Sequence, residues 1–446
     1  MSRTHRPEGS PYAPNREAET AAMLDALGIE SVEELFDIPE AVRFDDSFDI
    51  QARSEQEVIR EVEGLFEEND DIVSFLGRGS HSHYIPALVD HIAGRSEFLT
   101  SYTQYQPEAS QGFLQALFEY QSIIVELTGL EVANCSLYDA ATALGEAATF
   151  SDRLRQTSGD RILVPEQLHP GRRSTLENYC LGPGLTVESY PMDDGTADIE
   201  ALEAAIDEET VMVYAESPTV RGTLEPELAA IGELASDGDA AFCLGTDPVA
   251  LSILERPADV GADVVIGDAG VLGLPDSFGM GLGLFATREE YVRQVPGRLV
   301  GASDDQEDNR AFALTLVTRE QHIRRERATS NICTNQAWAA LRSAMHAAYL
   351  GPEGLVDLAK QCVERPKEVA ERMDDIGGVT APMHDRHHFR EFTWDCGEDA
   401  SRVADVLINR GFAVHALEDD VLQLRVTDQP QPAVDRFIEE LTEVLA

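Results

Sequence analysis

Apolar residues in the first third of the chain recur three and four positions apart, which predicts helices. Residues 17–70 contain two such stretches, EAETAAMLDALG and SEQEVIREVEGLF. Two further helices are expected over residues 110–130 and 136–154. Ser110 can cap the first of these and Gly129 can end it.

The pattern changes after residue 160, where short apolar runs alternate with helix-like segments. This alternation predicts a large domain with a mostly parallel, doubly wound sheet, an α/β fold. The expected strands are 161–165, 185–191, 210–216, 241–247, 263–268 and 282–287.

The last quarter of the chain predicts long helices over 334–375, followed by a small α+β domain. In that domain we expect strands at HFREFTWDC and VLQLRV, and a helix between them at SRVADVLINRG. A closing helix is expected from near Pro432. We therefore expect an N-terminal helical arm at 1–80, a large domain at 81–335, and linking helices with the small domain at 336–446.

The chain is strongly acidic, with a formal net charge of −48 and only 34 lysines and arginines together. Two of these are lysines, Lys360 and Lys367, and the acidic residues are spread along the whole chain. Such a surface repels nucleic-acid phosphates. It suits a cytoplasm at molar salt, where repulsion is screened within ~3 Å, and we favour this halophilic interpretation over that of an ordinary acidic protein.

Cysteine spacing and hydropathy indicate the cellular compartment in which this chain is expected. The 6 cysteines are scattered singly, without a CxxC pair, which fits a reduced cytoplasmic chain and disfavours zinc. No run of 18 apolar residues and no N-terminal apolar signal segment is present, so we expect neither a membrane span nor secretion.

A polar, tyrosine-rich cluster at residues 79–112 is the first candidate for chemistry. Its side chains stack or donate hydrogen bonds, which suits a pocket, but a polar seam between subunits with buried tyrosine hydroxyls explains them equally well. His81 and His83 have the spacing of a metal pair, yet no third ligand follows, so no metal site is expected. The cluster includes His83, Tyr84, Tyr102, Tyr105, Gln106 and Glu108.

An arginine-rich segment, TREQHIRRERATSNICTNQ at 318–336, is the second candidate. Residues 319–327 alone contain four arginines. Ion pairs with the chain's own carboxylates are slightly favoured, but arginine also recognises carboxylate or phosphate groups. The following Ser330, Asn331 and Thr334 can hydrogen-bond an anion.

These two segments, with FLGRGSHSHYIPALVDHI, the stretch from Ser96 to Leu144 and VPGRLVG, resemble one family. The sequence is similar to subunit 1, the α chain, of glycine dehydrogenase (decarboxylating), the P-protein of the glycine cleavage system. The resemblance spans residues 15–446 and is weakest at 155–290 and in the tail. It breaks between 266 and 282, where GDAGVLGLPDS replaces the family's usual pattern.

The resemblance implies a fold-type I, aminotransferase-like enzyme that uses pyridoxal phosphate. It implies decarboxylation of glycine and transfer of the aminomethyl group to the lipoyl arm of the H-protein. Loss of CO₂ leaves a carbanion, for which the cofactor's pyridine ring supplies the electron sink. The split form of the family implies an α2β2 heterotetramer with subunit 2.

In fold-type I enzymes one strand ends in an aspartate for the pyridine nitrogen, and a later strand delivers the Schiff-base lysine. Asp247 stands where that aspartate is expected, but Asp268 and Ala269 stand where the lysine is expected. Lys360 and Lys367 lie far downstream, and arginine makes no Schiff base. We therefore expect this chain not to hold the cofactor covalently, in line with a family whose lysine belongs to subunit 2.

The leading hypothesis is a required subunit that completes an active site at the interface with subunit 2. Two alternatives are a self-sufficient pyridoxal-phosphate decarboxylase or lyase, and a non-catalytic scaffold. The residues expected in the pocket are His83, Tyr84, Tyr102, Tyr105, Gln106 and Glu108, and those expected at the partner's cofactor phosphate are Ser330, Asn331 and Thr334.

Overall fold

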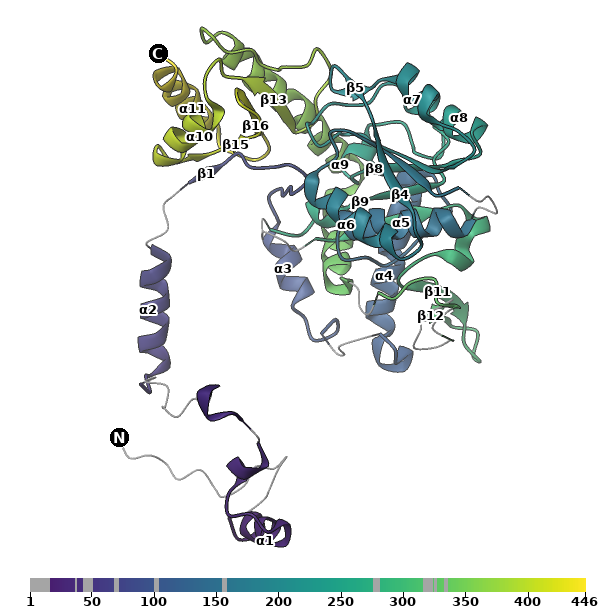
Figure 1. The fold of residues 1–446 in the computed structure, drawn as a ribbon, viewed down its shortest axis with the longest axis vertical. Coiled ribbons are helices and arrows are strands. Elements are labelled where there is room, and N and C mark those ends of the chain that lie inside the picture. Colours follow the sequence, from purple (N-terminus) through teal and green to yellow (C-terminus); the bar gives the residue numbers. More distant parts are fainter. Residues whose placement is uncertain are drawn as a thin grey trace. The chain divides into compact units, whose positions relative to one another are not determined.

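The chain divides into two units, Met1–Asp70 and Asp71–Ala446. The computed structural model, drawn in Figure 1, describes residues 17–36, 38–42, 51–67, 72–99, 104–154, 159–275, 281–315, 324, 327–332 and 336–446.

The first unit consists of two α-helices, α1 (Glu17–Leu27) and α2 (Glu55–Glu67), and two short 3₁₀ turns, Val32–Leu35 and Glu40–Val42. Ser54 and Glu57 fix the start of α2, since the Ser54 N–H donates to Glu57 Oε2 at 2.8 Å and the Glu57 N–H donates to Ser54 Oγ at 3.3 Å. The helical pattern predicted over 17–70 is confirmed for these segments.

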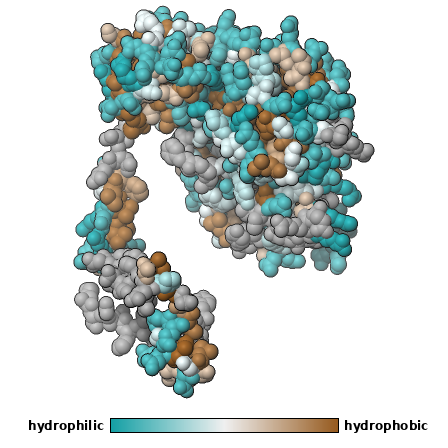
Figure 2. All heavy atoms as spheres, viewed as in Figure 1, coloured by the Kyte–Doolittle hydropathy of each residue, from teal (hydrophilic) through white to brown (hydrophobic). Residues whose placement is uncertain are grey.

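Helix α2 exposes an apolar face. None of the residues in α1 or α2 is buried, and Figure 2 shows apolar side chains gathered along one side of α2. An apolar stripe on a helix is characteristic of a surface that another chain or element covers. The stripe consists of Val58, Ile59, Val62, Leu65 and Phe66.

The second unit is built on a seven-stranded sheet of order β2-β10-β9-β8-β7-β3-β4. The strands β9, β8, β7, β3 and β4 run parallel, and β10 pairs antiparallel with both β9 and β2. The predicted mostly parallel sheet is confirmed. Its strands are β2 (Val132–Ala133), β3 (Arg161–Pro165), β4 (Thr186–Tyr190), β7 (Thr210–Glu216), β8 (Ala241–Thr246), β9 (Val264–Asp268) and β10 (Gly283–Thr287).

Helices cover both faces of this sheet, as the continuous apolar runs of its strands require. Successive residues of a strand point to opposite faces, so Val213 joins one core and Tyr214 the other. One face packs on α5 (Ala140–Leu154) and α6 (Pro170–Leu181), and the other on α4, α7 and α8 (Figure 1). These last three helices span Pro107–Thr128, Ile199–Ala205 and Leu228–Asp237.

Helix α4 differs at its start from the prediction. Gly129 ends it in the left-handed region, at φ 71°, as expected. Ser110 is not its cap, because the helix begins at Pro107, a residue suited to the first helical position. Ser110 lies inside the helix at a kink, with φ −126° and ψ 17°, and is buried.

The long helix α9 (Ala337–Asp374) links the sheet to the C-terminal region and bends at Gly351, where φ is 64°. The region holds an antiparallel sheet of order β13-β16-β15 and the helices α10 and α11, as predicted. Its core includes Phe75, Trp394 and Phe437. The elements are β13 (Glu391–Asp395), α10 (Ala400–Asn409), β14 (Phe412–Ala413), β15 (His415–Ala416), β16 (Val421–Arg425) and α11 (Gln431–Val444).

Smaller elements complete the second unit. Strand β1 pairs in parallel with β14, which ties residues 73–74 to the C-terminal region. None of the described helices is both long and apolar enough to cross a lipid bilayer. The remaining elements are β1 (Val73–Ser74), α3 (Ala87–Ala93), β5 (Met192–Asp193), β6 (Thr196–Ala197), the hairpin β11 (Leu299–Asp304) and β12 (Arg310–Thr315), and 3₁₀ turns at Ala250–Ser252, Ala269–Val271 and Glu289–Gln294.

Candidate functional site

Three neighbouring parallel strands end in acidic residues at one edge of the large sheet. Glu216 ends β7, Asp247 follows β8, and Asp268 ends β9. The carboxyl ends of parallel strands are where ligands bind in open α/β sheets. A cavity of about 460 Å³ lies there, and its charged and imidazole side chains are Arg78, His81, Asp139, His169, Arg172, Asp268 and His415.

Asp247 is neutralised by an arginine from the C-terminal region. The Arg390 Nη1 and Nη2 atoms donate to the two carboxylate oxygens at 3.0 and 3.4 Å, and both residues are buried. Burial by itself raises the pKa of Asp247, but Arg390 and the backbone N–H groups of Val249 and Ala250 outweigh it and lower that pKa. The carboxylate is therefore charged and fully engaged within this chain.

The end of β9 carries no amine. Asp268 accepts hydrogen bonds at Oδ1 from the N–H groups of Gly270 at 2.7 Å and Leu282 at 3.0 Å. Lys360 and Lys367 are both exposed on α9 and do not line the cavity. These residues do not fit covalent pyridoxal phosphate, since no lysine is available and Arg390 occupies Asp247.

A second buried ion pair lies beside the cavity. Arg172, on the first turn of α6, donates from Nη1 to Glu216 Oε1 at 2.6 Å. The same oxygen accepts the Tyr214 hydroxyl at 2.7 Å. Burial raises the pKa of Tyr214 far above its usual range, so the phenol stays protonated and holds the carboxylate in place.

His81 reaches into the same cavity and contacts Glu391 of β13. Its Nε2 lies 3.0 Å from Glu391 Oε1, and its Nδ1 is buried without a partner among the described residues. Burial lowers the pKa of His81 well below its usual range, and the nearby arginines lower it further. The imidazole is therefore neutral at physiological pH.

His83 and Tyr84 are placed away from that cavity. His83 is buried, with Nδ1 3.5 Å from Asp428 Oδ1 and Nε2 3.8 Å from the Cys362 sulfur. Tyr84 is exposed, and its backbone N–H donates to Asp428. His83 is thus surrounded by protein, whereas the Tyr84 phenol is open to solvent.

The segment 104–111 lies against the β11–β12 hairpin. Arg298, just before β11, donates from Nη2 to the Tyr105 hydroxyl at 2.9 Å. Gln111 bonds both to the carbonyl of Phe312 at 2.8 Å and to its N–H at 2.9 Å. Gln106 and Glu108 are exposed at the start of α4, and Tyr102 lies outside the described residues.

Ser330 is engaged with a buried carboxyl group of α5. Its hydroxyl donates to Glu146 Oε1 at 3.0 Å and accepts the Ile332 N–H at 3.2 Å. Burial raises the pKa of Glu146 to about 7, against the smaller opposing effects of Ser330 and Arg153. Asn331 is exposed, and Thr334 lies outside the described residues.

Three of the predicted residues therefore have separate settings: His83 lies beside Asp428, Tyr105 beside Arg298, and Ser330 beside Glu146. Sequence reasoning missed the cavity residues Arg78 and Arg172. The available signals were weak: Arg78 lies in a glycine-rich turn, and Arg172 follows a His-Pro-Gly helix start.

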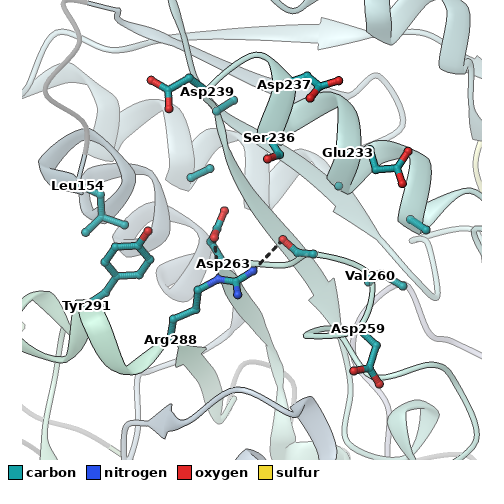
Figure 3. A pocket seen from close by; sticks show the side chains of 15 residues that line it. Leu154, Glu233, Ser236, Asp237, Asp239, Asp259, Val260, Asp263, Arg288 and Tyr291 are labelled. Carbon is teal, nitrogen blue, oxygen red and sulfur yellow. Dashed lines mark hydrogen bonds and ion pairs between the residues drawn. The ribbon is translucent and has the colours of Figure 1, made fainter.

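A larger depression, of about 710 Å³, lies at the opposite edge of the sheet, where β8 begins (Figure 3). Its lining is acidic, and Arg288 spans it to reach Asp263 Oδ1 at 2.8 Å and the carbonyl of Gly261 at 3.3 Å. Among the described residues, no group of three or more His, Cys, Asp or Glu is arranged to hold a metal ion. This depression is a solvated acidic surface, far from the strand ends that position chemistry.

The architecture has counterparts among solved structures. A sphingosine-1-phosphate lyase of Burkholderia pseudomallei superposes with a TM-score of 0.65 at 17% identity, covering 90% of this chain and 92% of that one. At that identity the likeness shows the fold alone. The chain thus has the fold-type I architecture of pyridoxal-phosphate enzymes, as its sequence implied.

Closer relatives define the family. The profile of the glycine cleavage system P-protein matches residues 10–442. A crystal structure of glycine decarboxylase (P-protein) in inhibitor-bound form superposes with a TM-score of 0.85 at 36% identity, covering 98% of this chain and 100% of that one. The chain belongs to the glycine cleavage system P-protein family.

Two curated relatives carry the same description. A probable glycine dehydrogenase (decarboxylating) subunit 1 of Halobacterium salinarum is 60% identical and covers 98% of this chain and 99% of its own. A protein of the same description from Shouchella clausii is 43% identical over 92% of this chain and 90% of its own. The Halobacterium relative accords with the halophilic composition.

Proposed function

We propose that this chain is the α subunit of a glycine dehydrogenase (decarboxylating), active only with a paralogous subunit 2. The names of its relatives support the reaction. One observation favours dependence on a partner: the end of β9 offers Asp268 and Ala269 rather than a lysine. The partner then supplies the lysine and the covalently held pyridoxal phosphate.

The apolar stripe of α2 supports assembly with another chain. Its five large apolar side chains are between 41% and 69% exposed. Covering such a helix face removes apolar area from water at a gain of ~25 cal/mol per Å². We propose that this stripe packs on subunit 2 in an α2β2 heterotetramer.

The polar segment at 104–111 is the proposed contribution of this chain to the shared pocket. Tyr105 is 43% exposed, and Arg298 holds its hydroxyl. Gln106 and Glu108 are exposed on the same turn. A tyrosine fixed by an arginine is a positioned hydrogen-bonding group, which a substrate carboxylate or a proton transfer requires.

The other predicted residues differ in how accessible they are to a pocket shared with a partner. Tyr84 and Asn331 are exposed and free to reach a partner. His83 and Ser330 are buried and act by holding their neighbours, Asp428 and Glu146. We extend the proposal to Tyr102 and, at the partner's cofactor phosphate, to Ser330, Asn331 and Thr334.

The full reaction involves two further participants. Glycine is the substrate, and the lipoyl arm of the H-protein accepts the aminomethyl group. We place the reaction in the cytoplasm, in line with the scattered single cysteines.

The test is a tagged pull-down of this chain from its host at molar salt, followed by borohydride reduction and mass spectrometry. The phosphopyridoxyl group is expected on a lysine of a co-purifying paralogue of similar size. Its recovery on Lys360 or Lys367 would favour a self-sufficient enzyme. A partner without the group, in a complex that still turns over, would contradict the proposal altogether.

A further inference from the structure

Arg78 lines the cavity at the carboxyl edge of the sheet, and its guanidinium has no partner among the described residues. Its backbone lies in the left-handed region, at φ 58°, a conformation that is unfavourable for a residue other than glycine. Its N–H donates to Glu391 Oε2 at 2.8 Å, which holds that conformation. Within the described part of the chain, its guanidinium makes no hydrogen bond or ion pair.

That isolation is unusual in a chain with a net charge of −48. Two imidazoles, those of His169 and His415, lie close enough to Arg78 to respond to its charge. After burial, Arg78 is among the causes that lower the pKa of His169 and of His415. Both imidazoles line the cavity and are neutral at physiological pH, so neither adds a second positive charge beside Arg78.

Two carboxyl groups, those of Asp139 and Asp268, line the same cavity as Arg78. Asp139 and Asp268 flank Gly281, where an added Cβ would lie 2.7 Å from Asp139 Cβ and 2.9 Å from Asp268 Oδ2. Their described hydrogen bonds use only the Oδ1 atom of each, from the N–H groups of Thr142, Gly270 and Leu282. Among the described contacts, one oxygen of each carboxyl group is left for a ligand. Arg172 offsets part of the repulsion of Asp268 by Asp139, and a ligand cation beside the pair relieves it further.

We propose that this cavity binds a small free α-amino acid, with its carboxylate on Arg78 and its ammonium beside Asp139 and Asp268. A zwitterion matches a cavity that is lined by both a cation and a pair of carboxyl groups, because each of its charges gains a charge-assisted hydrogen bond. Binding is non-covalent, since the end of β9 carries no lysine.

The cavity suits this ligand class better than a simple anion. Its volume of about 460 Å³ admits a small amino acid. A phosphate or a bare carboxylate would satisfy Arg78, but would lie near Asp139 and Asp268 without any gain from them. This second, non-catalytic binding site goes beyond the proposed function and requires neither a partner nor turnover.

The test measures ligand binding to the full chain alone, in molar potassium chloride, by equilibrium dialysis with labelled glycine. Glycine is expected to bind saturably at one site per chain, and more tightly than acetate or methylammonium. Arg78→Gln should weaken glycine and acetate binding by roughly tenfold or more. Asp268→Asn, which keeps the Oδ1 acceptor, should weaken glycine binding but not acetate binding.

Arg402→Gln is the matched control, because Arg402 lies on α10 in an exposed pair with Glu398. The circular dichroism of each variant confirms folding, and Asp268→Asn alone suffices if Arg78→Gln does not fold. Absence of saturable glycine binding, or unchanged binding in the folded variants, would overturn the proposal. Acetate bound as tightly as glycine would overturn it in favour of an anion site. Neither result bears on whether the complex decarboxylates glycine.

Discussion

Two buried carboxyl groups of this chain have opposite surroundings. Asp247 at the carboxyl edge of the sheet has both oxygens paired with Arg390, and its pKa is lowered. Glu146 on α5 has the Ser330 hydroxyl as its hydrogen-bond donor, and burial raises its pKa to about 7. The first group is neutralised within the chain, whereas the second keeps a proton near neutrality.

The carboxyl edge of the sheet, where Asp247 lies, has its buried charge paired within the chain. The region around Glu146 has no such ion pair among the described residues. Asp247, which the resemblance led us to expect at the cofactor, fastens the C-terminal region to the sheet through Arg390. The segments carrying Tyr105 and Ser330 instead leave polar groups at or near the surface. We therefore expect substitutions in the first region to affect stability, and substitutions in the second to affect pH response, turnover and assembly.

The largest effect is expected from Arg390→Met, which leaves Asp247 buried without its counter-charge. The free energy of unfolding should fall by about 3–5 kcal/mol, measured by denaturant titration at constant salt. Arg402→Met is the control, because it breaks an exposed pair worth at most about 1 kcal/mol. Equal losses of stability from the two substitutions would show that the buried Asp247–Arg390 pair matters no more than an exposed pair.

Glu146→Gln should change how stability depends on pH. The carboxyl titrates near 4.5 when unfolded and near 7 when folded, so the folded state binds more protons between these values. Stability from this group is present below about 4.5 and is lost as pH rises through 7.

The stability of the wild type relative to Glu146→Gln should therefore fall by roughly 3 kcal/mol between these pH values. Chemical denaturation of both proteins at pH 5 and pH 8 measures this. Glutamine keeps the acceptor for Ser330, so a difference independent of pH would show that burial does not hold the proton on Glu146.

Tyr105→Phe tests whether the second region contributes to the pocket. Removing the hydroxyl held by Arg298 should lower turnover of the assembled complex at least about tenfold, with assembly intact. Tyr349→Phe, at an exposed tyrosine on α9, serves as the control. Unchanged turnover and assembly in Tyr105→Phe would favour a scaffold role for this segment.

Val62→Asp places a charge on the apolar stripe of α2 and should weaken association with subunit 2 by about tenfold. Sedimentation at fixed molar salt measures the effect. Gln56→Asp adds the same charge to α2 outside the stripe and should leave association unchanged. Equal loss in both variants would attribute the effect to charge rather than to the stripe.

Local pattern predicted much of the secondary structure. The short apolar runs predicted as strands form β3, β4, β7, β8, β9 and β10 in the structure. They could be predicted because a strand buried on both faces needs continuous apolar residues. Ser110 was assigned wrongly as a cap, since Pro107 starts the helix earlier and tertiary packing buries the serine at a kink.

The sequence by itself determined that no lysine follows the strand ending at Asp268. The chain has only two lysines, and the apolar pattern places both far downstream of that strand. Only the tertiary structure decided that Asp247 is paired with Arg390, 143 residues later, and that His81 rather than His83 faces the cavity. Both depend on long-range packing of the C-terminal region on the sheet edge. Spacing along the chain carries no information about such contacts, because the fold sets which distant residues meet.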